Sequence, residues 1–229
     1  MRSSRSARRR PARIAPAPQE QSGRERILAV AIKMFSEAGY DGTTTAGVAR
    51  EAGVTQPLVH HHFGSKDGLW EAAMEELFRD VQRFTAPRDG AVAERLLGPI
   101  EDFVRFVSVR PEVTRVVARE GAAPSPRLTH LVDRYLRKPF RHVVAAVREG
   151  QKAGLIATDV RPELVLFLVL GAGSHLFDVT ALARESVGLD ATTPATREAF
   201  VRLIRETLVG GIFRDAPVTG PKRRGSRKG

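Results

Sequence analysis

The chain has 229 residues, 42% of them hydrophobic, which is enough to bury a core and argues against global disorder. It contains no cysteine, which excludes disulfides, cysteine-based zinc sites and a thiol nucleophile. The net charge of +11 lies at the ends, because residues 21–213 carry 25 basic and 24 acidic residues, a net charge of +1.

The two ends of the chain are basic and have no hydrophobic period. Residues 1–20 hold six Arg and one Glu, and 214–229 hold six basic residues and one Asp, which predicts a flexible arm and a flexible tail. Such segments attract phosphates without sequence preference, but they are also common as solvated termini without a role. The longest apolar run, Leu164–Gly173, is shorter than the ~20 residues that span a bilayer, and no signal peptide is evident. We therefore expect a soluble, cytoplasmic protein without a membrane partner.

The first predicted helix begins after Ser22, which forms a capping box with Glu25. It continues to Gly39, where the absent side chain favours a stop. Its apolar positions recur at helical spacing and predict a buried face made of Ile27, Leu28, Ala31, Met34, Phe35 and Ala38.

Residues 44–66 predict two short helices joined by a tight turn. Thr44 is the N-cap of a helix over 45–52, Gly53 provides the turn, and Thr55 is the N-cap of a helix over about 56–62 with Pro57 in its first turn. Small Ala49 and the valines of both helices allow the steep crossing of a helix-turn-helix. The second helix would then present a polar edge suited to a DNA major groove.

The remaining chain predicts only helices, so the fold class is all-α. Ser65 caps a helix from Lys66 to about Phe84. Pro and Gly breaks separate further helical segments, which are 91–108, 111–120, 125–153, 161–186 and 195–213. Pro139 is expected to kink the segment 125–153.

The last two helical segments differ from the others in hydrophobicity. The run Leu164–Leu170 is apolar on every side, which predicts burial all round. The final helix has a wide apolar arc made of Phe200, Val201, Leu203, Ile204, Leu208, Ile212 and Phe213. Together they favour half of a four-helix homodimer interface, and a monomeric core is the alternative.

Residues 22–70 resemble the N-terminal DNA-binding domain of the TetR family of bacterial transcriptional regulators. The resemblance rests on Gly39-Tyr40, Thr43-Thr44, Val48-Ala49, Ala52-Gly53-Val54, Val59, His62-Phe63, Lys66 and Leu69. It implies a homodimer with a three-helix head, expected over 21–66, and a helical ligand-binding and dimerisation core, expected over 67–213. It also implies that a small molecule changes the separation of the two heads and lowers operator affinity.

The resemblance also implies roles for single residues of the head. Thr43, Thr44 and Lys66 would contact phosphates, and Gln56 would bind a base edge. Histidines stand where the family usually has aromatic residues, and they can still stack or hydrogen-bond. The predicted DNA-binding residues are Thr43, Thr44, Thr55, Gln56, Pro57, Leu58, His60, His61 and Lys66.

We expect neither a metal nor a cofactor, because consecutive helical residues such as His60–His62 point about 100° apart and cannot converge on one ion. A ligand pocket is expected among the helices between residues 91 and 186, with apolar walls and a few polar groups. The candidate lining residues are Phe103, Phe106, Arg119, His130, Tyr135, His175 and Asp178, although residues of these types in helices are more often ordinary core or surface residues than ligand contacts.

The sequence therefore predicts a ligand-responsive, sequence-specific DNA-binding regulator, a repressor that an effector releases from a palindromic operator. An alternative is a helical architectural protein that binds DNA mainly through its basic tails. A third possibility, an enzyme that uses the C-terminal cavity, has little support, because there is no paired-carboxylate spacing, nucleophile elbow or phosphate-binding glycine loop.

Overall fold

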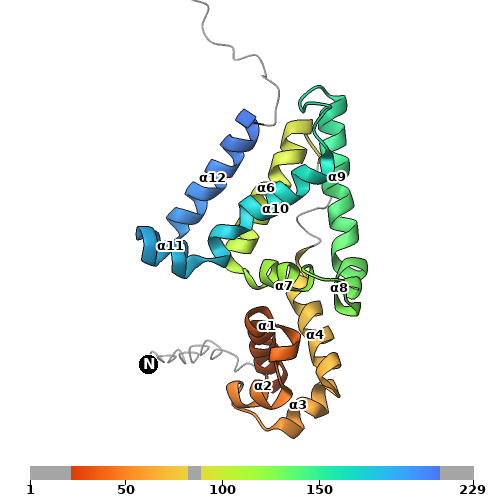
Figure 1. The fold of residues 1–229 in the computed structure, drawn as a ribbon, viewed down its shortest axis with the longest axis vertical. Coiled ribbons are helices and arrows are strands. Elements are labelled where there is room, and N and C mark those ends of the chain that lie inside the picture. The colour runs from red at the N-terminus through yellow and green to blue at the C-terminus, as the bar shows by residue number, and fades with distance from the viewer. Residues whose placement is uncertain (1–21, 82–88, 212–229) are drawn as a thin grey trace, which may run out of the picture.

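The computed structural model describes residues 22–81 and 89–211, and the predicted basic arm and tail lie outside these ranges. The regular structure of the described residues is helical, which confirms the predicted all-α class. A lower head and an upper body are visible in Figure 1. The head contains α1 (Gly23–Gly42), α2 (Thr45–Glu51), α3 (Gln56–Phe63) and α4 (Lys66–Phe78). The body contains α6 (Val92–Val109), α7 (Glu112–Glu120), α8 (Pro126–Leu131), the π-helical turn η1 (Val132–Leu136), α9 (Arg137–Lys152), α10 (Pro162–Asp178), α11 (Thr180–Val187) and α12 (Pro194–Gly211).

Helix α1 begins as the sequence predicts, with Ser22 and Glu25 forming a reciprocal capping box. Gly39 interrupts it with φ +75° and ψ 179°, a conformation that is essentially restricted to glycine. Ala38 is exposed, contrary to the expected apolar face, because the buried stripe ends beside this break. Ile32, only 6% exposed, completes the stripe instead.

The helix-turn-helix is built from local signals. The Thr44 side chain accepts a hydrogen bond from Gly47 N, and Gly53 makes the turn with φ +64°. Val48 and Val59 are buried between the two helices and the rest of the head. Thr55 occupies the N-cap position of α3, but its side chain makes no capping hydrogen bond.

Helix α4 packs against both the head and the body. Its buried residues Leu69, Trp70, Leu77 and Phe78 share one core cluster with α1, α2 and α3. The same cluster also contains Val113, Val116, Leu131, Tyr135 and Leu136 of the body, so α4 connects the head to the body. Residues 82–84, at the end of the helix expected from Lys66, lie outside the described ranges.

Two long segments that the sequence predicts as single helices are divided. The segment 161–186 breaks at Val179, and its two parts, α10 and α11, are bent by 66°. Arg115 Nη2 donates to the carbonyls of Phe177 and Asp178, at 3.2 and 3.4 Å, and so takes acceptors that a continuous helix would use. In 125–153 the π-helical turn η1 comes before Pro139, which has no N–H to donate to the Tyr135 carbonyl.

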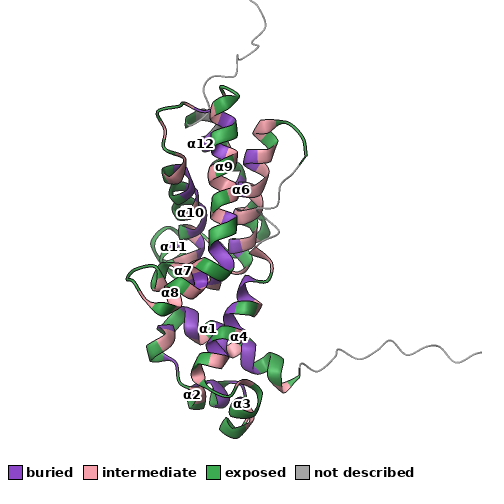
Figure 2. Ribbon diagram, turned by 90° about the vertical axis from the view of Figure 1, so that its right-hand side faces the viewer, coloured by how far each residue is buried: buried purple, intermediate pink, exposed green. Residues whose placement is uncertain are grey.

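The body core lies between α6, α9, α10 and α12, and buried residues occupy the inward faces of these helices (Figure 2). The predicted burial of Leu164–Leu170 on every side is not reached within one chain, because Leu164, Phe167 and Leu168 are 61%, 64% and 53% exposed. In α12, Leu203 is 56% exposed, whereas Val201, Ile204 and Leu208 are buried. Ile212 and Phe213 lie outside the described residues.

Across the described ranges, no one helix has both the length and the apolar character needed to cross a membrane. Only the bent pair formed by α10 and α11 passes the same test, on length and composition.

Candidate DNA interface and ligand cavity

The polar edge of the helix-turn-helix lies at the end of the head that is farthest from the body (Figure 1). Six of the predicted DNA-binding residues are exposed there: Thr44, Thr55, Gln56, Pro57, His60 and His61. Leu58 and Lys66 are half-buried. Eight of the nine predicted residues are therefore at least partly accessible.

Thr43 differs from the expectation. Its exposed fraction is 0%, its hydroxyl donates to Gly39 O at 2.8 Å, and its backbone N–H donates to Tyr40 O at 3.2 Å. Both of its donors are used inside the head, so Thr43 closes the end of α1 and does not present a group to a phosphate.

Gln56 is ordered by neighbours on the same edge. Its Nε2 lies 3.4 Å from Thr45 Oγ1 and 3.4 Å from His60 Nε2, and His60 Nδ1 lies 3.1 Å from Gly64 O. Because a carbonyl only accepts, we assign the proton of a neutral His60 ring to Nδ1, which leaves Nε2 to accept from Gln56. This arrangement leaves the Gln56 side-chain carbonyl to accept a hydrogen bond from a base amino group.

Lys66 contacts the head through an aromatic ring. Its Nζ lies 4.2 Å from the centroid of Tyr40, and the guanidinium carbon of Arg127, from α8 of the body, lies 4.3 Å from the same centroid. The Tyr40 hydroxyl donates to Asp67 Oδ1, and this hydrogen bond raises the Tyr40 pKa above its ordinary value of 10.0. A residue of the body therefore touches the same ring as the proposed phosphate-binding lysine.

The consecutive histidines do not form a metal centre, and no group of three or more potential ligands that could hold an ion occurs among the described residues. His61 and His62 instead make an edge-to-face contact, with ring centroids 5.3 Å apart. The His62 side chain is exposed.

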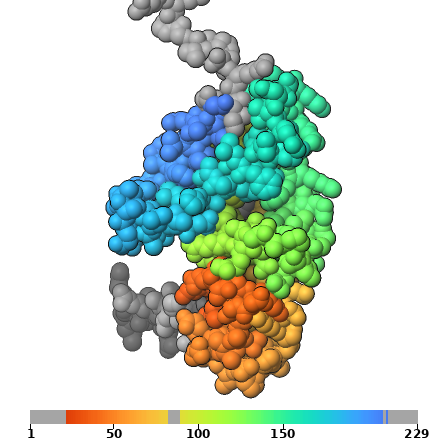
Figure 3. Space-filling model, viewed as in Figure 1, coloured from red at the N-terminus to blue at the C-terminus, as the bar shows by residue number. Residues whose placement is uncertain are grey.

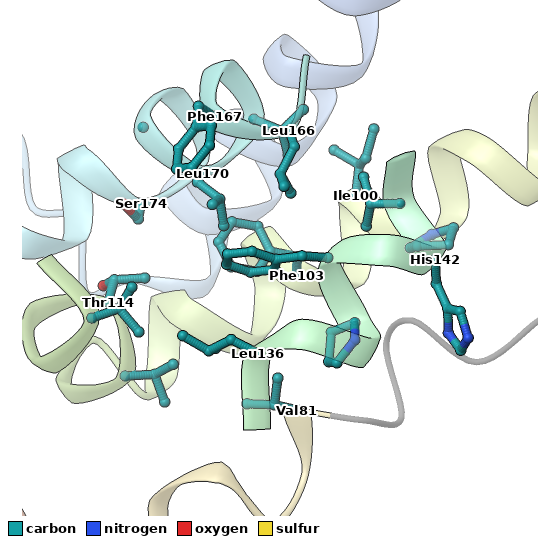
Figure 4. Close-up of a pocket in the computed structure, with 18 of the residues that line it drawn as sticks. Val81, Ile100, Phe103, Thr114, Leu136, His142, Leu166, Phe167, Leu170 and Ser174 are labelled. Carbon is teal, nitrogen blue, oxygen red and sulfur yellow. The ribbon is translucent and has the colours of Figure 1, made fainter. Parts of the chain in front are cut away.

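A cavity of about 910 Å³ occupies the body between α6, α7, η1, α9 and α10. Figure 3 shows the surface hollowed where α7, α9 and α10 meet. Most of the lining is aliphatic or aromatic, and Phe103, Leu136, Leu166 and Leu170 lie in its middle (Figure 4). Such a volume and lining are typical of a site for a large organic ligand.

Only part of the predicted ligand set lines this cavity. Phe103, Phe106 and Asp178 do, whereas Arg119, His130, Tyr135 and His175 do not. Arg119, His130 and Tyr135 lie instead where the body contacts the head. Arg119 Nη2 donates to Glu37 O at 2.7 Å, His130 lies edge-on to Trp70, and Tyr135 stacks on Phe78. His175 is exposed on α10.

The sequence interpretation missed most of the polar groups of the cavity. Thr114 and Ser174 lie at one end with Asp178, and Arg95, His142 and Glu149 line it elsewhere. Ser174 and Thr114 appear on one side of Figure 4 and His142 on the other. Single polar residues in amphipathic helices give no sequence signal of the direction they face, so only tertiary packing identifies them.

Helix α7 borders both the cavity and the head. Thr114 and Val117 line the cavity, whereas Val116 belongs to the core cluster shared by head and body, and Arg119 contacts α1. Val113 takes part in both. A molecule that fills the cavity therefore contacts the helix on which the head rests.

Family models match both parts of the chain. Residues 27–73 match the family described as "Bacterial regulatory proteins, tetR family", and residues 100–206 match "Tetracyclin repressor-like, C-terminal domain".

Among curated relatives, the HTH-type transcriptional repressor SCO4008 of Streptomyces coelicolor is 26% identical over 190 residues, which cover 81% of this chain and 94% of that protein. The HTH-type transcriptional regulator BetI of Burkholderia mallei is 38% identical over 71 residues, which cover 31% of this chain and 36% of that protein.

Solved structures share the fold of the whole body and head. The ketosteroid transcriptional regulator KstR2 of Mycobacterium tuberculosis superposes with a TM-score of 0.67 at 21% identity, covering 86% of this chain and 98% of that one. The regulator PfmR of Thermus thermophilus superposes with a TM-score of 0.61 at 21% identity, covering 86% of this chain and 100% of that one.

Proposed function

The chain belongs to the TetR family of bacterial transcriptional regulators and is a DNA-binding regulator, not an enzyme; we propose that it is a dimeric repressor that a small molecule releases from a palindromic operator. The observation that carries this proposal is the position of α7 between the cavity and α1. A ligand that favours a different position of α7 also favours a different orientation of the head. The ratio of its affinities for the DNA-binding and the released orientation determines how far operator affinity falls.

The proposed DNA contacts divide into two kinds. Gln56 and His60 read bases in the major groove, with Pro57 and Leu58 available for contact with a thymine methyl. Thr44, Thr55, His61 and Lys66 bind phosphates or position α3. Thr43 is left out of this set, because both of its donors are used inside the head.

The proposed dimer forms through the exposed apolar faces of α10 and α12. Leu164, Phe167 and Leu168 on α10 and Leu203 on α12 are more than half exposed, and large apolar side chains exposed on two helices favour an interaction site there. A symmetric dimer would place two copies of α3 on half-sites ~34–36 Å apart, or at a multiple of that spacing, and this predicts an inverted-repeat operator.

Selection of bound DNA from a random duplex library at moderate salt tests the proposal. Enrichment of an inverted repeat, bound with a stoichiometry of two chains, is the expected result. Recovery of unenriched DNA would contradict specific reading by α3. A chain lacking 1–20 and 214–229 separates this function from DNA association through the tails, because specific binding must survive the truncation if the head reads the operator.

A further inference from the structure

We propose that the effector is a large, mainly apolar molecule that is neutral or cationic and places a hydrogen-bond donor, a hydroxyl or an amine, against Asp178 and Ser174. The inference rests on the proposed function in taking the cavity as the effector site. It goes further in assigning the chemistry of the ligand.

The size and walls of the cavity set the first part of the assignment. Its volume of about 910 Å³ is near the upper end of the ~300–1,000 Å³ that is usual for ligand sites. The lining between its polar groups consists of Val, Leu, Ile, Pro and Phe side chains, which favour extended hydrocarbon surface. A small polar metabolite would leave most of this apolar wall in contact with water.

The polar end of the cavity is rich in acceptors. Asp178 Oδ1 accepts from the Thr114 hydroxyl at 2.8 Å, and Arg115 Nε lies 3.8 Å from the same oxygen. The other carboxylate oxygen of Asp178 makes no hydrogen bond to a described residue. It can therefore accept a hydrogen bond from a ligand.

Ser174 adds a second polar group at this end. It is only 7% exposed and lines the cavity, and its hydroxyl makes no hydrogen bond to a described residue. Because this hydroxyl is accessible from the cavity, a ligand hydroxyl or amine can hydrogen-bond with both Ser174 and Asp178.

The arginine in the lining and the arginine beside Asp178 already have partners, which disfavours an anionic ligand at these positions. Arg95 is the only Arg or Lys among the described lining residues, and its Nη2 pairs with Glu149 Oε2 at 2.7 Å. Arg115 approaches Asp178 and donates to two backbone carbonyls. At the Asp178 end a ligand carboxylate would face a like charge, and pairing with Arg95 would require it to displace Glu149.

Isothermal titration of the full chain with four matched dodecyl compounds tests the assignment. Dodecanol and dodecylamine supply a donor, dodecanoate supplies an anion, and dodecyl methyl ether supplies neither a donor nor a charge. We expect dodecanol and dodecylamine to bind at least ~10-fold more tightly than dodecanoate at neutral pH. Equal or tighter binding of dodecanoate, or binding of none of the four, would overturn the assignment.

Two substitutions locate the effect. Asp178→Asn should reduce the ratio of the affinities for dodecylamine and dodecanoate by ~10-fold. The affinity for dodecanol should stay nearly unchanged, because Asn keeps an acceptor oxygen. Ser174→Ala should weaken dodecanol but not the ether. The control Asp133→Asn removes an exposed carboxylate that pairs with Arg137 and does not line the cavity, and it should change nothing. An unchanged ratio in Asp178→Asn, with a native circular dichroism spectrum, would refute the role of Asp178.

These titrations contain no DNA. Failure of the ligand assignment therefore leaves operator selection unaffected, and failure of operator selection leaves the titrations interpretable.

Discussion

The guanidinium carbon of Arg127 lies 4.3 Å from the centroid of the Tyr40 ring, so a cation of the body rests on an aromatic residue of the head. The same guanidinium, through Nε, donates to Glu120 at 3.2 Å, at the end of the helix that lines the cavity. Lys66, a proposed phosphate contact, also lies over the Tyr40 ring. A movement of α7 relative to α1 can therefore change the position of Lys66 through Arg127 and Tyr40.

Replacing Arg127 with Leu should reduce the response to ligand. The change removes a cation–π contact worth ~0.5–2 kcal/mol and the ion pair with Glu120, so the head loses one attachment to the body. We expect operator binding to persist while its loss on ligand addition becomes smaller, as measured by fluorescence anisotropy with and without ligand. Arg137→Leu removes an exposed ion pair on α9 and serves as the control. A full ligand response in Arg127→Leu would contradict this coupling.

Both tyrosines should lose their phenolic protons at higher pH in the folded protein than in the unfolded chain. The chain has only two, and the pKa of each is raised, that of Tyr40 mainly by its hydrogen bond to Asp67 and that of Tyr135 mainly by burial. Tyrosinate absorbance should therefore appear above pH 10 in the folded protein and at lower pH in denaturant. Because the folded state holds these protons more tightly, this contribution to stability is complete below pH 10 and is lost as the pH rises through the folded pKa values.

Asp67→Asn tests the cause assigned to Tyr40. It removes the charge that holds the phenolic proton, so one of the two tyrosines should titrate at lower pH than in the unchanged protein. If both tyrosines keep their titration, Asp67 does not control Tyr40.

Substitutions of Gln56 and Lys66 should affect DNA affinity in different ways. Gln56→Ala should cost ~1–3 kcal/mol on the selected operator and little on random DNA, because base contacts carry the discrimination. Lys66→Ala should weaken binding to every sequence and lower the salt slope by about 1. Competition titrations at several salt concentrations distinguish the two. Equal losses on both kinds of DNA for Gln56→Ala would argue against base reading.

Gly39→Ala should destabilise the fold more than Gly53→Ala. Both glycines have positive φ, of +75° and +64°, but a Cβ on Gly39 would lie 2.8 Å from Arg119 Cδ, whereas a Cβ on Gly53 would meet no atom within 4 Å. Gly53→Ala therefore costs only backbone strain of ~1–2 kcal/mol, and Gly39→Ala costs strain plus displacement of Arg119. Urea unfolding measures both, and equal losses would mean that the joint accommodates the methyl group without a cost.

Leu168→Glu and Leu203→Glu should abolish the dimer. Both leucines are more than half exposed on α10 and α12, so the change leaves the core of each chain intact while placing charges in the proposed interface. Sedimentation should give a monomer, and affinity for the full operator should fall. Val109→Glu changes an equally exposed residue on α6 and should remain dimeric. A monomeric unchanged protein would refute the dimer itself.

The head could be predicted from sequence because its signals are local. Ser22 with Glu25, Thr44 and Gly53 each determine a cap or a turn within a few residues, and the structure has all of them. Thr43 was assigned to DNA by resemblance, and its spacing from Gly39 gave no warning that the carbonyl four residues earlier would take its hydroxyl.

The cavity could be predicted only as a region. Arg119, His130 and Tyr135 have the residue types of ligand contacts, but packing of α7, α8 and η1 against the head directs them to the joint. The break at Val179 has a similar origin, because it depends on hydrogen bonds from Arg115, more than sixty residues earlier in the chain. Interactions at such separations leave no periodic signal in one sequence.

The two-sided contact of α7 has a consequence for genetics. In the proposed mechanism, substitutions at Thr114 or Val117 should alter which effector binds, whereas substitutions at Val116 or Arg119 should alter whether effector binding changes DNA binding. For the proposed repressor, alleles that leave target genes permanently silent should then also arise at positions that do not contact the effector. A lineage can exchange one inducer for another by changing one side of a single helix while keeping the other side, and the regulatory response with it.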